Sequence, residues 1–321
     1  MIRYLARRCG QALIVLFLVT ILVFSLSKLL PGGPARAILG VHATPTTIAA
    51  FNQENGLDSP PPVQYWHWLS GVLTGNLGFS FVLNQSVGAL LAQRLPKTAL
   101  LAGVAVVLAV LVAIPVGLYQ AVRRNKADDY ALTTVTFTLY STPAFWLALL
   151  LIDLFAVRLH MFAANAPQGN FSAIIADPSA MVLPVLTIAL VSIAAFSRYV
   201  RSSVLDELAQ DYVRMARSKG GSRRHVLVGH VLRNSLSPVV TLLGLSLPFI
   251  LSGTLITEQV FNYPGVGLLF FGAAQSQDYP VLLGVVLVVG VATVVGSLLA
   301  DITYAVLDPR VRYVGDRGGR S

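Results

Sequence analysis

Six stretches of this sequence are apolar over about 20 residues or more, the length that a helix needs to cross the hydrocarbon core of a membrane. They cover residues 9–30, 97–122, 130–157, 181–200, 236–257 and 281–306. None of them alternates apolar and polar residues in the manner of a β-barrel strand. Because lipid offers the backbone no hydrogen-bond partners, the sequence predicts an all-α polytopic membrane protein with six transmembrane helices.

The composition excludes the soluble classes of protein. Charged residues make up 12% of the 321 residues and hydrophobic residues 55%, whereas an ordinary soluble domain is about 25% charged. This chain cannot cover a water-soluble core with polar side chains, and it is too hydrophobic to be disordered. Its single cysteine, Cys9, excludes a disulfide within the chain and a metal site built from cysteines.

The basic residues indicate the orientation in the membrane. If the N-terminus lies inside, 18 of the 23 Lys and Arg residues fall in the inner segments. The other five are Lys28, Arg36, Arg94, Lys97 and Arg158. Short inner loops obey the positive-inside rule, so both termini are expected in the cytoplasm. The net charge of +9 then follows from membrane topology, and we expect no nucleic-acid partner.

The first span has two interpretations. A basic start, an apolar run and Ala35-Arg36-Ala37 fit a cleaved signal peptide. The run is longer than a usual signal core, so an uncleaved anchor is favoured. Residues from about 31 to 96 then form an external segment, and one membrane domain covers residues 1–321.

The external segment is expected to contain two short helices. Residues 46–55 form the first, and residues 63–73 carry Tyr65, Trp66 and Trp68, which suit a helix at the outer membrane interface. A loop packed over the bundle is an equally good interpretation of this segment.

The longest inner segment, approximately residues 198–235, has the pattern of a helix, a turn and a second helix. Ser203 and Asp206 fit an N-cap with its capping-box acid. Acidic residues precede basic ones along the first helix, which complements the helix dipole. Residues at helical spacing form one apolar ridge, namely Leu205, Leu208, Tyr212 and Ala216.

An apolar ridge held clear of the bilayer needs a cover. A groove on a partner protein would provide one. The alternative is a helix that lies flat on the lipid surface, with its basic residues on anionic headgroups. The residues alone leave both interpretations open.

Gly220-Gly221 provides a left-handed stop after the ridge. The stretch Asp211-Tyr-Val-Arg-Met-Ala-Arg-Ser-Lys-Gly220 resembles the coupling loop of permease subunits in binding-protein-dependent ABC importers. In that motif three residues separate an Ala from an invariant Gly, and Ala216 and Gly220 match it. The continuation His230-Val-Leu-Arg-Asn-Ser-Leu-Ser-Pro238 resembles the peptide and nickel branch of the family.

Four other regions agree, so the resemblance covers nearly the whole chain. They are Leu30-Pro-Gly-Gly-Pro-Ala35, Gly75-Asn-Leu-Gly-Phe-Ser80 with Arg94-Leu-Pro96, Glu258-Gln-Val-Phe-Asn-Tyr-Pro-Gly-Val-Gly267, and Asp301-Ile-Thr-Tyr304 with Leu307-Asp-Pro-Arg310. Two residues depart from the family pattern: Gly33 stands where Asp is frequent, and Gly221 stands where an apolar residue is common.

The resemblance implies one half of a heterodimeric channel in a bacterial or archaeal cytoplasmic membrane, with the bundle of a type I ABC importer. The implied partners are a second related permease, two cytoplasmic ATPase subunits or one fused ATPase, an extracytoplasmic solute-binding protein and membrane lipid. Peptides are the commonest substrate class in this branch. Nickel or another small solute is the alternative within it.

The chain has no phosphate-binding loop of the Gly-x-x-x-x-Gly-Lys-Ser/Thr type. We therefore expect it to be no enzyme, with no cofactor of its own, while the partner ATPases bind ATP and Mg²⁺. The resemblance implies that the inner loop transmits closure of the ATPases to the bundle. The residues expected to couple the two are Leu208, Asp211, Tyr212, Arg214, Ala216, Lys219 and Gly220.

Two carboxylates lie inside predicted spans, where a charge costs roughly 2.5–3.5 kcal/mol. Neither Asp153 nor Asp301 has a basic residue four positions further on. A polar contact between helices is expected for Asp153, with a substrate amine or a proton path as the alternative. An ion pair with an arginine of the cytoplasmic face is expected for Asp301.

Two further patterns stay open in the sequence. His225 and His230 are five residues apart, so they are not expected to share a helical face or to bind a metal. Five prolines interrupt the predicted spans and form either a translocation path or ordinary bends. They are Pro115, Pro143, Pro184, Pro238 and Pro248.

Two rival classes of protein fit less well. A secondary transporter driven by an ion gradient needs polar groups deep in several helices, and only Asp153 and Asp301 qualify. A membrane-embedded enzyme needs a cluster of His, Asp or Glu near one face, and the sequence suggests none. Co-purification with an ATPase would distinguish an ABC permease from both.

Overall fold

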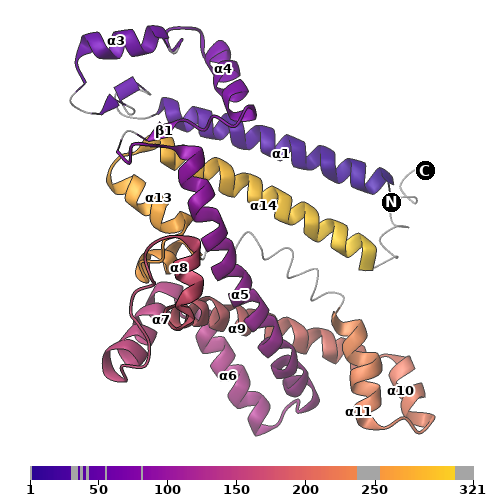
Figure 1. Ribbon diagram of the computed structural model, residues 1–321. Coiled ribbons are helices and arrows are strands. Elements are labelled where there is room, and N and C mark those ends of the chain that lie inside the picture. The colour runs from indigo at the N-terminus through magenta and orange to yellow at the C-terminus, as the bar shows by residue number, and fades with distance from the viewer. Residues whose placement is uncertain are drawn as a thin grey trace.

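The computed structural model of the chain is mostly helical (Figure 1). It describes residues 2–29, 35–36, 39–40, 43–54, 56–80, 82–236 and 254–307. The fifth predicted span, residues 236–257, lies almost entirely outside this part of the chain, and so do Pro238 and Pro248.

Long helices form the framework, and short elements connect them. The long helices are α1 (Ile2–Lys28), α5 (Val87–Val122), α6 (Ala127–Ser141), α9 (Val182–Leu208) and α14 (Tyr279–Leu307). The short elements are α3 (Pro45–Glu54), α4 (Pro61–Leu73), α7 (Ala144–Leu151), α8 (Phe171–Ala176), α10 (Asp211–Ser218), α11 (Arg223–His225), α13 (Val266–Gln275), the 3-10 helix η2 (Pro178–Met181), and the π-helices η1 (Ile152–Arg158) and η3 (Val226–Leu232). Strands β1 (Phe79–Ser80) and β2 (Gln85–Ser86) form a small antiparallel hairpin before α5.

Four described segments are long and apolar enough to cross a membrane. They are Ala6–Leu26, Val87–Val122, Pro178–Leu208 and Tyr279–Leu299. They confirm the predicted spans one, two, four and six as continuous apolar helices. The 36 residues of α5 extend for about 54 Å, well beyond the roughly 30 Å of a hydrocarbon core.

The third predicted span, residues 130–157, is not one straight helix. It divides into α6 and the pair α7–η1, which are bent by 107° to one another. Pro143 lacks the N–H that would continue α6, and Thr142 before it takes an extended backbone. Pro115 and Pro184 instead lie within α5 and α9.

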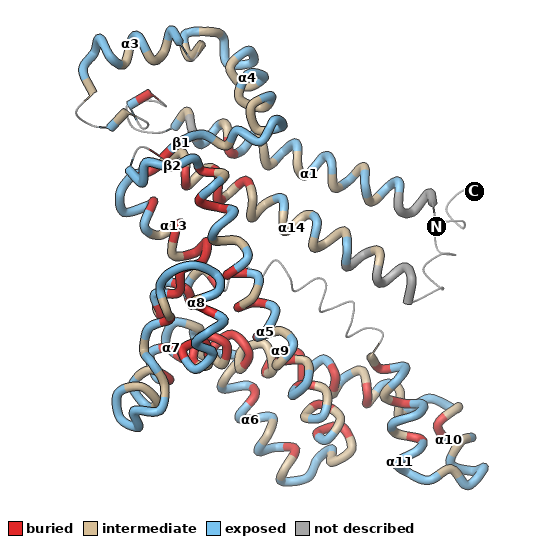
Figure 2. Tube along the Cα trace, in the orientation of Figure 1, coloured by how far each residue is buried: buried red, intermediate tan, exposed pale blue. Residues whose placement is uncertain are grey.

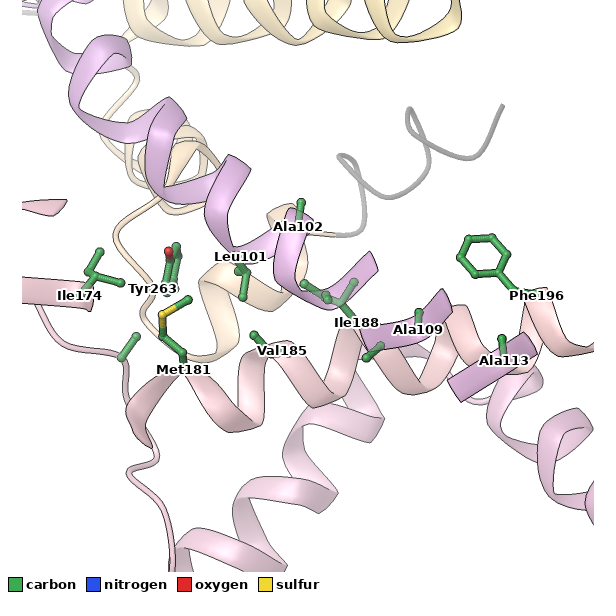
Figure 3. Packing of buried hydrophobic residues seen from close by; sticks show 13 residues of the cluster. Leu101, Ala102, Ala109, Ala113, Ile174, Met181, Val185, Ile188, Phe196 and Tyr263 are labelled. Carbon is green, nitrogen blue, oxygen red and sulfur yellow. The ribbon is translucent and has the colours of Figure 1, made fainter. Parts of the chain in front are cut away.

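Among the described helices, α5 and α9 make the most extensive contact. The contact face of α5 has a small residue at every fourth position, each buried: Ala105, Ala109, Ala113, Gly117 and Ala121. Figure 3 shows Ala109 of α5 near Ile188 of α9 and Ala113 near Phe196, within one buried cluster. Small residues let two backbones approach closely, which is how helices associate without a hydrophobic driving force in lipid.

Burial is concentrated around this contact. Figure 2 shows buried residues where α5 lies against α9 and where it lies against α13, while α1 is exposed or half-buried along most of its length. In the apolar span of α9, 56% of residues are buried, against 6% in that of α1. The helix α9 is therefore central, and α1 lies beside α14 at the edge of the molecule (Figure 1).

Both short helices predicted for the external segment are present as α3 and α4. Tyr65 of α4 packs edge-on against Phe17 and Phe24 of α1, with ring centroids 6.3 and 5.4 Å apart. The Tyr65 hydroxyl lies 2.8 Å from that of Thr20. The contact fixes α4 along α1, and its location at the membrane interface stays a prediction.

We predict that Gly117→Val forces α5 and α9 apart. A Cβ at Gly117 would lie 2.6 Å from the Ser197 carbonyl oxygen and from the Val200 Cβ, and overpacking of this kind costs about 1–3 kcal/mol. Thermal unfolding of the purified protein should show a lower midpoint. Gly103→Val on the exposed side of α5 meets nothing within 4 Å and should leave the midpoint unchanged; equal shifts in the two variants would contradict the packing argument.

Candidate functional site

The helix α9 leaves the bundle without a break and continues to Leu208. Ser203 lies inside it and donates a hydrogen bond to the Ser235 carbonyl, 2.9 Å away, so the predicted N-cap at Ser203 is wrong. The chain turns at Gln210, whose backbone is extended, and α10 begins at Asp211. Two helices around a glycine turn are therefore present, but α10 is separate from the helix that holds Ser203.

One face of α10 packs against the rest of the chain. Val213 is buried, and Tyr212 and Ala216 are half-buried beside Leu205 and Leu208. These residues pack on a cluster whose buried members are Ala121, Val200, Val204, Val213, Val226 and Val231. The apolar ridge therefore finds cover in α5, α9 and η3 of its own chain, where the sequence alone suggested only a partner or lipid.

Tyr212 also ties α10 to the end of α9. Its hydroxyl donates a hydrogen bond to the Glu207 carboxylate. Burial raises the pKa of Tyr212, and the hydrogen bond to Glu207 raises it further. The phenol therefore keeps its proton at neutral pH and holds the two helices together across the turn.

The opposite face of α10 is open. Asp211, Arg214, Met215 and Ser218 follow helical spacing and are all exposed, with 55% of Met215 accessible. Arg214 and Asp211 form a loose pair at 3.5 Å, with 77% and 95% of their side chains exposed. An exposed methionine between charged residues can adapt to an apolar pocket on a partner.

The glycine turn closes α10 with a Schellman motif. Gly220 has a φ of +81°, a conformation that side chains disfavour. Its N–H donates to the Arg217 carbonyl at 3.0 Å, and the Gly221 N–H donates to the Ala216 carbonyl at 3.1 Å. A Cβ at Gly221 would lie 2.8 Å from the same carbonyl oxygen, so this departure from the family pattern suits the turn.

A partly buried ion pair, which was not predicted from the sequence, fixes α9 near its C-terminal end. Arg201 contacts the Asp129 carboxylate at 2.9 and 3.1 Å, and only 3% of the Asp129 side chain is exposed. The Asn125 N–H also donates to Asp129. The hydrogen bonds from Arg201 favour the ionised carboxylate, and the pair joins the α5–α6 turn to α9.

Asp153 has a basic partner within its own helix. Arg158 contacts its carboxylate at 2.8 Å, with both side chains more than half exposed. The two residues lie five positions apart in η1, and the hydrogen bonds of a π-helix also join residues five apart. The expected contact between helices is therefore replaced by a local pair. Asp301 belongs to α14, but its side chain lies outside the described part.

The same geometry brings His225 and His230 together at the start of η3. Their ring centroids are 5.5 Å apart, so the expectation that they do not share a face is wrong. Within the described residues, no group of three or more His, Cys, Asp or Glu could hold a metal ion.

Near the N-terminal end of α5 lies the stretch from Glu258 to Gly267. The side chain of Glu258 is fully buried there. Glu258 accepts hydrogen bonds from the Thr98 hydroxyl and the Gly267 N–H, both at 2.6 Å. The Thr98 hydroxyl also accepts from the Val266 N–H at 2.9 Å. The sequence marked this stretch by resemblance only, because its partner Thr98 lies 160 residues earlier.

The four apolar helices and the bent third segment are the features of a multi-pass membrane protein. Residues 113–313 match the family described as the binding-protein-dependent transport system inner membrane component, and residues 1–102 match its N-terminal region. The chain belongs to this family, as its sequence predicts. It is a non-catalytic permease subunit of the cytoplasmic membrane, and such a system includes ATPase and substrate-binding partners.

Relatives match the chain from end to end. The oligopeptide transport system permease AppB of Bacillus subtilis is 37% identical over 98% of this chain and 100% of its own. The glutathione transport system permease GsiC of Salmonella typhimurium is also 37% identical, over the same shares. A crystallised amino acid ABC transporter covers 76% of this chain and 98% of its own at 16% identity and a TM-score of 0.47.

We predict that Val213→Ala loosens α10 from the chain, whereas Met215→Ala does not. Val213 is 1% exposed, and the loss of two buried methyl groups costs about 1–2 kcal/mol. Amide hydrogen exchange in α10 should therefore accelerate roughly tenfold in the first variant. If both variants exchange like the parent protein, the packing of α10 does not depend on Val213.

Proposed function

We propose that this chain forms one half of the membrane channel of an ATP-driven importer for peptides. The observation that carries the proposal is the end-to-end match to permeases named for oligopeptides and for glutathione, itself a small peptide. Nickel or another small solute carried by the same machinery is the alternative to be tested.

The proposed topology has six spans and one membrane domain over residues 1–321, with both termini in the cytoplasm. Residues from about 31 to 96 are external, and residues from about 198 to 235 form the cytoplasmic coupling loop. The distribution of Lys and Arg supports this orientation. The separation of α10 and α11 from α13 and the β1–β2 hairpin, at opposite ends of the bundle, is consistent with it (Figure 1).

The proposed complex contains a second related permease and two ATPase subunits, or one fused ATPase. The ATPases bind ATP and Mg²⁺, and an extracytoplasmic protein delivers the peptide. Nothing in this chain resembles a phosphate-binding loop, so the energy for transport comes from these partners.

In this proposal the ATPase binds α10 and moves it. Asp211, Arg214 and Lys219 contact the ATPase, together with the exposed Met215. Leu208, Tyr212 and Ala216 attach α10 to the rest of the chain, because they pack on the cluster around Val213. Gly220 fixes the turn that returns the chain toward the membrane.

The movement then passes into the bundle through α9. This helix runs for 27 residues without a break, so a shift of its end is transmitted along its axis. Arg201 and Asp129 join the C-terminal part of α9 to the α5–α6 turn. The helices rotate as rigid bodies and alternate between inward-open and outward-open states.

The function is tested with the reconstituted complex of both permeases, the ATPase and the loaded binding protein in liposomes. ATP hydrolysis should rise on addition of a di- or oligopeptide, and labelled peptide should accumulate inside. Stimulation by Ni²⁺ without stimulation by peptides would support the alternative. Transport by this chain without any ATPase would overturn the proposal.

We predict that Gly220→Val abolishes peptide uptake while the protein still inserts into the membrane. A β-branched side chain at a φ of +81° strains the turn by about 1–2 kcal/mol and misplaces α10. Uptake and membrane abundance are measured together. The control is Gly10→Val on α1, where a Cβ meets nothing within 4 Å. Normal uptake by the Gly220 variant would show that the position of α10 does not matter for transport.

We predict that Met215→Asp lowers uptake at least about tenfold, the scale of a central interface residue, without lowering thermal stability. The charge faces solvent in the isolated chain but enters the ATPase contact in the complex. Val228→Asp on η3 is the matched control, since Val228 is 53% exposed against 55% for Met215. Equal losses in both variants would show that the contact is not specific to α10.

A further inference from the structure

The carboxylate of Glu258 is positioned at the start of α13. It accepts from the Gly267 N–H at 2.6 Å, in the first turn of α13, where backbone N–H groups lack partners within the helix. Glu258 therefore caps α13 from outside the helix, from eight residues before its first residue.

Two glycines make room for this carboxylate. A Cβ at Gly265 would lie 2.4 Å from both oxygens of Glu258. A Cβ at Gly267 would lie 2.4 Å from the Leu255 Cα and 2.9 Å from one Glu258 oxygen. Neither residue has a positive φ, so space and not conformational freedom requires glycine there. The two glycines thus let the backbone pack closely around the carboxylate.

The same carboxylate reaches the long helix α5. Thr98 of α5 donates to Glu258 and accepts from Val266, so one hydroxyl joins the carboxylate, the start of α13 and α5. A second tie lies beside it, where the Tyr263 hydroxyl donates to the Lys97 carbonyl at 2.8 Å. Glu258, Thr98 and Tyr263 are all buried, and a buried hydrogen-bond network holds one arrangement when every partner is present.

The helix α13 is too short to span a membrane. Its 10 residues extend for about 15 Å. It lies against the first part of α5 and the start of α14, in a cluster that includes Leu91, Leu269 and Val281. Figure 1 shows α13 at the end of the bundle that carries the β1–β2 hairpin, away from α10. In the proposed topology this end of the bundle is extracytoplasmic, so α13 lies at the outer mouth of the channel.

We propose that Glu258 is a positioning residue that binds α13 to α5 and makes the two helices one rigid gate unit at the extracytoplasmic mouth. This inference rests on the proposed importer function and topology. The ATPase moves α9, α9 moves α5 through their close contact, and α5 carries α13 with it. Because the gate moves with α5, it follows the movement that begins at the ATPase. The two ends of the channel therefore change state together.

The test measures the distance between α5 and α13 during the transport cycle. Nitroxide labels are attached at Gln93 of α5 and Gln275 of α13, both exposed, in a complex in which Cys9→Ser removes the native thiol. Electron–electron double resonance compares the nucleotide-free complex with the complex trapped by ATP and vanadate. We expect the same narrow distance distribution in both states.

The variant Glu258→Gln replaces one carboxylate oxygen, which accepts hydrogen bonds, with an amide group that cannot accept them, while it keeps the shape of the side chain. We expect its distance distribution to broaden already in the nucleotide-free complex. Peptide uptake should fall roughly fivefold or more, the usual scale of a lost coupling between sites, while the ATPase activity without peptide is unchanged. A narrow distribution in this variant, or a change of distance between the two states of the parent complex, would overturn the proposal.

Two variants of Thr98 keep the test decisive if Glu258→Gln fails to assemble. Thr98→Val removes the bridging hydroxyl at constant shape, and Thr98→Ser restores it. Only Thr98→Val should broaden the distance distribution and lower uptake. Equal behaviour of the two variants would contradict the proposal that Thr98 and Glu258 bind α13 to α5. Failure of the importer function is seen separately, as a parent complex in which peptide does not stimulate ATP hydrolysis.

Discussion

The close contact between α5 and α9 is the constraint on which the rest of the structure depends. Lipid tails are as apolar as the side chains of these helices, so burial of apolar surface drives no association in a membrane. Two helices therefore associate where their surfaces fit closely. The small residues from Ala105 to Ala121 provide that fit, and Gly117 leaves no room even for a methyl group. The two helices bear the functional elements, since α9 leads toward α10 and α5 holds the loop before α13.

Buried polar contacts fix both ends of this helix pair. At one end the Arg201–Asp129 ion pair joins α9 to the α5–α6 turn, and at the other Thr98 joins α5 to Glu258. Such contacts add little net stability, because desolvation offsets the attraction, but they are costly to break and therefore specify one arrangement. In the proposed function, movement at one end of this helix pair reaches the other end through these contacts.

Several corrections have one local cause, which is backbone geometry that sequence spacing does not reveal. The sequence predicts an α-helix around Asp153 and after His225, and residues five apart then point in different directions. Both segments are π-helices, whose hydrogen bonds join residues five apart, so Asp153 meets Arg158 and His225 meets His230. Likewise, Pro143 predicts an interruption, but not the 107° bend.

The membrane class, most of the spans and the stop at Gly220 could be predicted without the fold, because they follow from apolar length and local backbone preference. The family followed from the motifs around Ala216–Gly220 and Glu258–Gly267. The covered face of α10 required the fold, since the position of α9 and η3 determines which face is buried. The role of Glu258 likewise required the fold, because its hydroxyl partner is 160 residues away and no local pattern encodes a contact at that distance.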